Sequence, residues 1–392
     1  MRHACTATTI LLLANSAFAQ GQAASWPQWR GPNRDGISTE KLRSKQTELW
    51  ATNVGLGYST VSVANGRIYT MGHDKAAKKD TVFCIEADTG IDVWTKTFDC
   101  QTLNRFHGGG SQTTPSLDGD RLYVSGREGK LFCLDAKTGK EIWKQDLSKE
   151  YGLRLPLWGW AASPLILDDM IVLSMGHVFA FKRDGKLLWK TEENFRTSYS
   201  TPVDCKLYGR DCIADFNGHG IVILDRKSGE MMSQHKWATR SGVNVASPIV
   251  IGDRIFISSG YNTGCAMLQT KGNDKLEVLW ENREMRNHMS GCVYHKGHLY
   301  GFDESTLKCL DLQGEVKWAE RGLGKGALVM ASGKLAIMSA RGELVIADAS
   351  ADGFEEVSRT KVLSGGVYWT TPVVCGGRLY VRNSIGDLVC LE

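Results

Sequence analysis

A short segment returns along nearly the whole length of this chain. Residues 131–143 read LFCLDAKTGKEIW: an apolar strand, a turn carrying glycine, and a second strand that ends in tryptophan. Related segments, most of them also ending in tryptophan, occupy residues 82–94, 178–189, 221–233 and 307–318. An element that returns every 40 to 50 residues predicts a repeat architecture. Repeat folds carry both enzymes and non-catalytic scaffolds, so the repeat constrains the fold and leaves the function open.

A second marker, a Thr/Ser-Pro pair that opens an apolar strand, sets the number of repeats. Clear copies begin at Thr114, Ser163, Thr201, Ser247 and Thr371, and degenerate copies begin at Thr60, Ser290 and Gly326. After each start the sequence gives a strand, a Gly or Asp hairpin turn and another strand, followed by the tryptophan-ending pair. Four antiparallel strands per repeat are typical of a propeller blade. We therefore predict an all-β fold: an eight-bladed β-propeller of four-stranded antiparallel blades.

The two ends of the chain predict how the ring closes. The last repeat, from Thr371, stops at Leu391 and Glu392 without a fourth strand. Residues 47–54 (TELWATNV) form an isolated fourth strand with its own Trp50. We expect this N-terminal strand to pair with the strand ending at Leu391 and to complete the last blade. Closure of this kind removes the exposed sheet edges that promote aggregation.

The first residues resemble a secretory signal peptide. Arg2 supplies positive charge, residues 10–14 are apolar, and residues 17–19 (AFA) form an A-x-A cleavage site. The apolar run is too short to span a bilayer, and we predict no transmembrane segment. The mature protein is expected to be exported, to the periplasm or the cell exterior. The predicted division is a signal peptide at 1–19, an N-terminal extension at 20–46 and a single propeller domain at 47–392.

Charge and cysteine content add weaker constraints. A formal net charge of +4 gives no reason to expect nucleic-acid binding. Cysteines that share one repeat position are interpreted as small buried apolar residues; they are Cys84, Cys133, Cys309 and Cys390. Cys205 and Cys212 flank one predicted hairpin turn and could pair, although spacing does not set connectivity.

The turn pattern AxTGxxxW, as in residues 136–143, resembles the repeat of pyrroloquinoline-quinone (PQQ)-like propellers, and the resemblance covers residues 47–392. The segment WPQWRGPNRDGIS, residues 26–38, is similar to the N-terminal signature of exported members of that group. Two branches share the repeat. One contains the quinoprotein alcohol dehydrogenases, and the other contains the propeller lipoprotein of the bacterial outer-membrane assembly machine, a non-catalytic scaffold.

The resemblance implies different requirements for the two branches. The dehydrogenases hold PQQ over a tryptophan floor, bind Ca²⁺ through Glu and Asn, use an Asp base and often carry two adjacent cysteines. This chain has no Cys-Cys pair and no C-x-x-C-H haem motif, and it is short for that branch. It also lacks a lipid-anchor cysteine, because Cys5 precedes the apolar run. We predict a non-catalytic binding or scaffold module without cofactor or metal; the alternative is a PQQ- and Ca²⁺-dependent oxidoreductase acting on alcohols or sugars.

A binding site is predicted at the mouth of the central channel, where the linkers between blades meet. Five consecutive linkers carry arginine: Arg105, Arg154, Arg196, Arg240 and Arg286. The other candidates at this mouth are His107, Trp158, Trp160, Tyr199, Asn217, Asn244, His288 and Trp369. Because arginine favours bidentate contact with carboxylate or phosphate, we predict a basic, aromatic-containing mouth for a peptide, protein or anionic ligand. The alternative is a set of solvated loop charges, paired with neighbouring glutamates, above packed aromatic side chains.

No residue is assigned a catalytic or metal-binding role. His107 precedes three glycines, but no helix is expected after them to supply the positive end of a phosphate site. The turn at residues 215–219 (DFNGH) has too few oxygen ligands for Ca²⁺ and is interpreted as turn chemistry.

Overall fold

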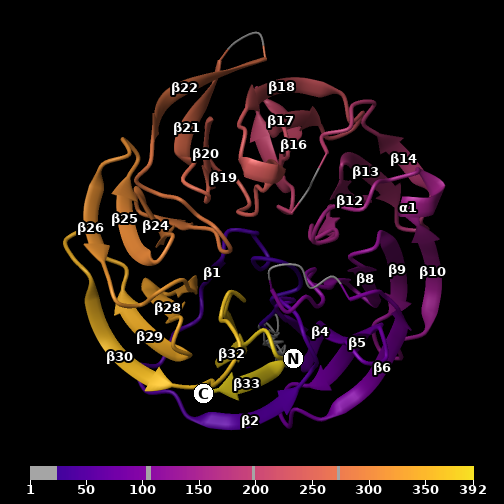
Figure 1. The fold of residues 1–392 in the computed structure, drawn as a ribbon, viewed down its shortest axis with the longest axis horizontal. Coiled ribbons are helices and arrows are strands. Elements are labelled where there is room, and N and C mark those ends of the chain that lie inside the picture. The colour runs from indigo at the N-terminus through magenta and orange to yellow at the C-terminus, as the bar shows by residue number, and fades with distance from the viewer. Residues whose placement is uncertain (1–23, 103–106, 197–198, 272–273) are drawn as a thin grey trace, which may run out of the picture.

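The computed structural model describes residues 24–102, 107–196, 199–271 and 274–392. The strands of this part of the chain form eight sheets arranged as a ring of blades (Figure 1). The prediction of an eight-bladed propeller with four-stranded antiparallel blades is confirmed. The predicted signal peptide lies outside the described residues.

The strands follow one another from the channel outward in each blade. Blade 1 holds β3 (Ser62–Ala64), β4 (Arg67–Asp74), β5 (Lys79–Glu86) and β6 (Asp92–Asp99). Blade 2 holds β7 (Ser116–Asp118), β8 (Arg121–Ser125), β9 (Lys130–Asp135) and β10 (Glu141–Asp146). Blade 3 holds β11 (Leu165–Ile166), β12 (Met170–Met175), β13 (His177–Lys182) and β14 (Leu187–Lys190). Blade 4 holds β15 (Val203–Leu207), β16 (Arg210–Asn217), β17 (Gly220–Asp225) and β18 (Met231–Lys236).

Blade 5 holds β19 (Ile249–Ile251), β20 (Arg254–Ser259), β21 (Gly264–Lys271) and β22 (Lys275–Asn282). Blade 6 holds β23 (Val293–His295), β24 (His298–Asp303), β25 (Thr306–Asp311) and β26 (Val316–Glu320). Blade 7 holds β27 (Ala327–Ala331), β28 (Lys334–Met338), β29 (Glu343–Asp348) and β30 (Glu355–Lys361). Blade 8 holds β31 (Val373–Cys375), β32 (Arg378–Arg382), β33 (Asp387–Leu391) and β2 (Glu48–Asn53). The short helices α1 (Leu147–Glu150) and η1 (Arg240–Gly242) lie in linkers.

The ring closes as the sequence predicts. Strand β2 pairs antiparallel with β33, and Trp50 lies opposite Cys390. The side chain of Arg382 reinforces this seam from the inside, because its Nη1 donates to the carbonyl of Met71 at 2.7 Å and its Nη2 to that of Gly55 at 2.9 Å. Burial lowers the pKa of Arg382 to about 9. The last blade is therefore joined to the first by strand pairing and by a buried guanidinium.

In the repeat, the tryptophan of one blade packs against the turn glycine of the next blade. The indole of Trp94, at the outer edge of blade 1, donates from Nε1 to the carbonyl of Ala136 in blade 2 at 3.0 Å. A Cβ on Gly139 would lie 2.5 Å from the Trp94 ring. The same contact recurs at other junctions, between Trp50 and Gly90, Trp143 and Gly185, Trp189 and Gly229, and Trp280 and Gly314. The glycine of the repeat is needed both for its positive φ and for the space that the ring of the preceding blade occupies.

Hydrogen bonds join most neighbouring Thr/Ser-Pro starts at the channel, and we call this set of bonds the girdle. The Thr114 amide donates to Ser163 Oγ at 2.9 Å, and the Ser163 amide donates to Thr201 Oγ1 at 3.0 Å. The Ser247 hydroxyl donates to the Thr201 carbonyl at 3.1 Å. Equivalent bonds join Thr60 to Thr114, Thr60 to Thr371, and Ser290 to Gly326. Each hydroxyl therefore ties the start of one blade to the start of its neighbour.

The segment of residues 24–40, which we call the plug, lies inside the ring (Figure 1). Trp26 forms an antiparallel bridge with Val63 of blade 1, and the Leu117 amide of blade 2 donates to the Pro27 carbonyl at 2.7 Å. Strand β1 (Ile37–Ser38) pairs parallel with β27 and adds a fifth strand to blade 7. The repeat pattern does not predict this strand, because the plug carries no repeat.

Side chains of the plug reach other blades. Arg34 Nη2 donates to the Ile166 carbonyl of blade 3 at 2.9 Å. The carboxylate of Glu40 accepts from the amides of Gly376 and Gly377 in blade 8, at 2.9 and 2.7 Å. The extension at residues 20–46 is thus bound to the propeller over its described part rather than separate from it.

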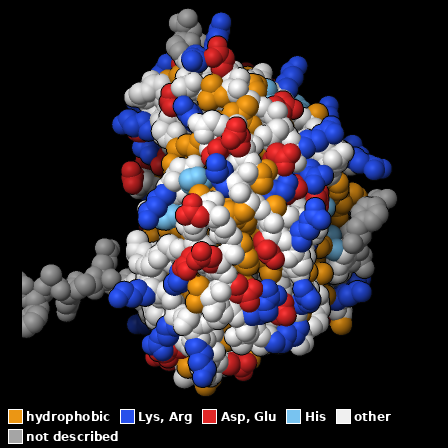
Figure 2. Space-filling view, turned by 90° about the vertical axis from the view of Figure 1, so that its left-hand side faces the viewer, with side chains coloured by type: hydrophobic (Ala, Val, Ile, Leu, Met, Phe, Trp, Pro, Cys, Tyr) orange, Lys and Arg blue, Asp and Glu red, His pale blue; other side chains and the backbone are white. Residues whose placement is uncertain are grey.

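The outer edge of the ring is polar and mixed in charge. Figure 2 shows acidic and basic side chains intermingled with small apolar patches over the side of the molecule that carries β26 and β30. In β30 exposed positions alternate with less exposed ones from Val357 onward. The mixed pattern agrees with the small net charge. The repeated cysteines Cys84, Cys133, Cys309 and Cys390 are buried, and Cys205 lies opposite Cys212 with both thiols free.

The tryptophan–glycine contact can be measured with a matched pair of variants. Gly139 and Gly119 both have positive φ, at 71° and 59°, but only Gly139 faces a tryptophan ring. Gly119→Ala should lower the free energy of unfolding by about 1–2 kcal/mol through backbone strain. Gly139→Ala should lower it by about 2–5 kcal/mol, because the methyl group must also displace Trp94. Chemical unfolding measures both, and equal losses would contradict the packing role.

A buried carboxyl near the end of β16 gives a second prediction. Asp215 is 0% exposed, and its Oδ2 accepts from Asn217 Nδ2 at 2.9 Å. Burial raises the pKa of Asp215 to about 6. The unfolded chain has a pKa of about 3.9 at such a group. Stability is therefore lost as the pH rises from about 4 to about 6, because only the folded state resists ionisation.

Asp215→Asn should remove that loss. The variant should gain on the order of 1–3 kcal/mol of unfolding free energy over the wild type at pH 8, and much less at pH 4. Urea unfolding at both pH values measures the gain, with the exposed Asp120→Asn as the control. A difference that stays constant between the two pH values would refute the assignment.

Candidate functional site

A cavity of about 370 Å³ opens on the axis of the ring, at the face where the linkers between blades meet. We call it the cup. All eight linkers contribute residues to its lining. One residue from each, in ring order starting with the linker between blades 8 and 1, gives the series Tyr58, His107, Trp158, Tyr199, Val243, His288, Lys325 and Trp369. The volume lies in the range of small-ligand pockets. Residues distant in sequence are brought together here because each linker begins at the girdle.

The plug supplies the floor of the cup. Trp29 and Arg30 line the cavity together with the linker residues. Trp29 is held by a hydrogen bond from its Nε1 to Ser247 Oγ at 3.4 Å. Arg30 is held by a bond from its Nη2 to the Cys292 carbonyl at 2.8 Å. The plug therefore occupies the channel next to the cavity.

One wall of the cup is aromatic. Tyr58 and Trp369 stack with ring centroids 5.5 Å apart and an interplanar angle of 17°. His107 meets the Tyr58 ring edge-on at 5.4 Å. Further round, Trp158 and Tyr199 form an edge contact at 5.9 Å. Half-buried aromatic rings of this kind present flat apolar surface to a ligand.

The opposite corner is polar. Lys325 Nζ lies 2.8 Å from Glu304 Oε2, and His288 Nδ1 lies 3.2 Å from the same oxygen. Burial lowers the pKa of His288 below its ordinary value, and the nearby Lys325 adds to this effect. Burial also lowers the pKa of His107. Both histidines are therefore neutral at neutral pH, and Lys325 is the cation of the cup wall.

The structure gathers five of the predicted mouth residues in the cup: His107, Trp158, Tyr199, His288 and Trp369. Three others are buried behind it. Trp160 packs in an apolar cluster with Phe179. Asn244 donates from Nδ2 to the Asn217 carbonyl at 2.6 Å, and the Asn217 amide donates to Asp215. The two asparagines connect linkers and strands rather than face the cavity.

The arginines are placed differently from the expectation. Arg105 lies outside the described residues, and Arg154, Arg196 and Arg240 are exposed away from the cup lining. Arg286 forms a two-point ion pair with Asp303, at 2.6 Å from Nε to Oδ1 and 3.0 Å from Nη2 to Oδ2. Ligand binding by this set stays a prediction, and the described members do not converge on the cavity.

The cations that line the cup are instead Arg30 and Lys325. Sequence reasoning missed both. Arg30 lies in a segment without repeat pattern, whose place in the ring no periodicity predicts. Lys325 lies in the linker between the sixth and seventh blades, which is not among the linkers predicted from the sequence to carry binding residues.

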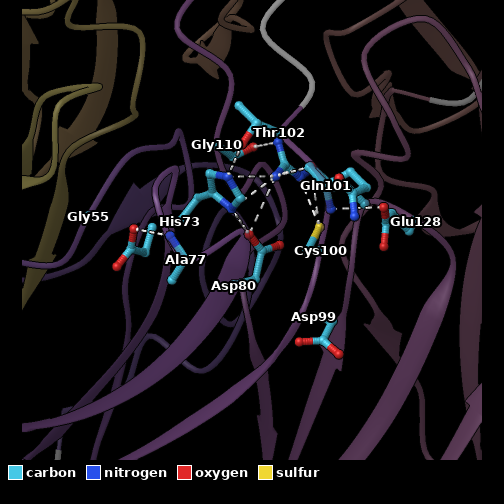
Figure 3. Close-up of polar contacts among 12 residues, drawn as sticks. Gly55, His73, Ala77, Asp80, Asp99, Cys100, Gln101, Thr102, Gly110 and Glu128 are labelled. Atoms are coloured by element: carbon cyan, nitrogen blue, oxygen red, sulfur yellow. Dashed lines mark hydrogen bonds and ion pairs between the residues drawn. The ribbon is translucent and has the colours of Figure 1, made fainter.

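A buried charge cluster stands behind the linker that carries His107 (Figure 3). His73 Nδ1 lies 2.7 Å from Asp80 Oδ1, and His73 Nε2 lies 2.7 Å from Thr102 Oγ1. Arg127 Nη2 lies within 3.4 Å of both nitrogens of His73, so the guanidinium covers the face of that ring. Arg127 Nη1 donates to the Gly110 carbonyl at 3.2 Å. The cluster therefore holds the linker in place from behind, and its own side chains do not line the cup.

The residues of the cup do not fit a Ca²⁺-bound quinone. Ca²⁺ takes about six to eight oxygen ligands, among which carboxylates dominate. Among the residues that the structure describes, no aspartate or glutamate lines the cup. Within the described residues, no group of three or more His, Cys, Asp or Glu side chains is placed to hold a metal ion. No helix in this part of the chain is both long and apolar enough for a membrane span.

Comparison with solved structures places the fold among known propellers. BamB from Moraxella catarrhalis matches with a TM-score of 0.64 and 16% identity, over 89% of this chain and 98% of that chain. The quinohemoprotein alcohol dehydrogenase from Comamonas testosteroni matches with a TM-score of 0.52 and 14% identity, over 94% and 80%. The computationally designed protein Ika8 matches with 0.61 and 9%, over 88% and 98%. Likeness at such identities establishes the fold alone.

No curated protein matches the sequence at a significant level. A family model does: the one described as outer membrane protein assembly factor BamB matches residues 78–320, more than half of the chain. The match covers the blades that carry the tryptophan–glycine repeat. The chain therefore belongs to the family described as outer membrane protein assembly factor BamB.

Proposed function

We propose that the protein is an exported, non-catalytic binding module that holds a segment of a partner polypeptide in the cup. One observation carries the proposal: all eight linkers line one cavity, to which the plug adds Trp29 and Arg30 and whose wall carries stacked aromatic rings. Such a cavity offers the anchor site that buried aromatic contacts provide in protein interfaces. The family description, an assembly factor, and the signal-like N-terminus support the assignment and favour the periplasm or the cell exterior.

The two histidines of the cup are held by hydrogen bonds within the protein. His107 Nδ1 accepts from the Gly109 amide at 3.1 Å, which fixes the proton on Nε2. His288 Nδ1 lies within hydrogen-bond distance of both Lys325 Nζ and Glu304 Oε2. A general base must offer an unprotonated nitrogen to the proton it abstracts, and the protonated Nε2 of His107 does not offer one. The alternative, an oxidoreductase, is supported by the fold that the chain shares with quinohemoprotein alcohol dehydrogenases. The side chains that line the cup do not provide the oxygen ligands that the Ca²⁺ of such an enzyme requires.

The proposal predicts that removing the stacked wall abolishes binding. Fluorescein-labelled decapeptides, selected from a random library on the wild-type protein, are titrated by fluorescence anisotropy. The double variant Tyr58→Ala with Trp369→Ala should bind them at least tenfold more weakly, since truncating an aromatic anchor costs about 2 kcal/mol or more. The control is Leu155→Ala with Leu157→Ala, which removes exposed apolar side chains from a linker on the same face outside the cup.

Equal losses in the two double variants would mean that the cup is not the binding site. A second measurement addresses the alternative. The protein is loaded with PQQ and Ca²⁺ and assayed for dye-linked oxidation of alcohols. Turnover would overturn the non-catalytic assignment, and its absence together with peptide binding would support it.

A further inference from the structure

We infer that the cup captures the C-terminal residue of a polypeptide, with the α-carboxylate on Arg30 at the floor and an aromatic or large aliphatic side chain against the Tyr58–Trp369 wall. The inference rests on the proposed function and names the chemistry of its ligand. It follows from the hydrogen-bonding state of Arg30, from the space beside its guanidinium, and from the charge of the lining.

Arg30 is a buried cation whose hydrogen bonds go to neutral acceptors. Its Nε donates to the Arg34 carbonyl at 3.2 Å, and its Nη2 donates to the carbonyls of Asp35 at 2.7 Å and Cys292 at 2.8 Å. All three acceptors are neutral, and no ion pair to a carboxylate joins Arg30 within the described residues. Nη1 has no hydrogen-bond partner in the same part of the chain. The Asp35 carboxylate acts on Arg30 electrostatically but does not contact it as an ion pair. A buried charge without a contacting counter-ion is costly, so an anion in the cup would stabilise this arrangement.

The backbone of Arg30 shows that its position is imposed by the fold. Its φ is 62°, in the left-handed region that residues with a Cβ rarely adopt. Strain of this kind persists only where the surroundings hold it, and it concentrates at functional sites. The guanidinium is thus fixed at the floor before any ligand enters.

Arg382 provides the contrast. It is also buried, but both of its terminal nitrogens donate to carbonyls, which include those of Ser59, Met71 and Gly55. It does not line the cup. Both terminal nitrogens of Arg382 are therefore used to hold the seam between the last and first blades. Nη1 of Arg30, in contrast, has no hydrogen-bond partner among the described residues.

A glycine keeps the space beside Nη1 empty. Gly291 lines the cup, and a Cβ built on it would lie 3.1 Å from Arg30 Nη1. The conformation of Gly291 is not one that glycine alone adopts, because its φ is not positive. The absence of a side chain at this position leaves room for a ligand atom against the guanidinium.

The charges of the lining favour an anion, and the walls favour an apolar group attached to it. Among the described residues, Arg30 and Lys325 line the cup and no acidic residue does. Lys325 is paired with Glu304 at 2.8 Å, so Arg30 is the lining cation that lacks an ion pair in this part of the chain. An internal peptide segment would cover the aromatic wall but would pair with Arg30 only through an acidic side chain. An inorganic anion would pair with Arg30 and leave the wall uncovered. A chain terminus satisfies both, because its carboxylate and its last side chain diverge from one carbon, and the rest of the chain leaves through the mouth.

The first experiment compares one peptide in two forms. Acetyl-Ala-Ala-Phe with a free carboxylate and the same tripeptide as its C-terminal amide are titrated into the wild-type protein. The fluorescence of Trp29, Trp158 and Trp369, which line the cup, reports binding. The acid should bind at least tenfold more tightly, because charge-assisted hydrogen bonds to a guanidinium are about twice as strong as neutral ones. Equal affinities would overturn the inference.

The second experiment blocks Nη1 without removing Arg30. Gly291→Ala places a methyl group beside the guanidinium and should reduce the preference for acid over amide to less than threefold, with an unchanged melting temperature. Gly108→Ala is the matched control, since it adds a methyl group to a linker on the same face with nothing within 4 Å. A Gly291→Ala protein that folds normally and keeps the full preference would show that the carboxylate lies elsewhere.

Two further outcomes separate this inference from the proposed function. If hydrocinnamate, a small aromatic acid, binds as tightly as the tripeptide acid, the ligand is a free aromatic acid and the polypeptide terminus is rejected. If the acid and amide forms bind alike while the selected decapeptides still lose binding in the Tyr58→Ala, Trp369→Ala variant, the proposed function stands and the carboxylate assignment fails.

Discussion

The girdle of serine and threonine hydroxyls at the channel is the interaction on which the rest of the structure depends. Each bond joins the start of one blade to the start of the next, as between Thr114 and Ser163 at 2.9 Å. A hydrogen bond of this type contributes only about 1 kcal/mol, but its larger effect is geometric. Because all blades begin on one circle, the linkers that precede them must arrive at one place, and the cup follows from that convergence.

The repeat made much of the fold predictable. The Thr/Ser-Pro starts, the turn glycines and the outer tryptophans are local signals with a physical cause, since each fills a contact between neighbouring blades. The pairing of β2 with β33 was predictable as well, because Trp50 marks a fourth strand without a blade. The plug was not, since residues 24–40 have no periodicity and take their conformation from the channel that receives them.

The candidate site was predictable in its location and only partly in its residues. Linkers on one face must surround the channel, so His107, His288 and Trp369 could be assigned to the mouth from sequence. Whether a side chain turns inward depends on the linker conformation and on nearby partners. Arg286 forms an ion pair with Asp303 and does not line the cavity, and the cation at the floor comes from the N-terminal segment instead. Such competition among partners is invisible in a single sequence.

The plug and the closing strand lie close together near the N-terminus, and this has a consequence for folding order. Strand β2 pairs with β33, so the first blade strand in the sequence cannot form its pairing until the last strand has been synthesised. Residues 24–40 can take up their position only when the inner strands of the surrounding blades stand in a ring. Contacts between such distant parts of a chain form slowly. A polypeptide emerging N-terminus first would therefore acquire its ring and its cup in one late step, after the last blade has left the export channel or ribosome, and incomplete chains would have no binding site.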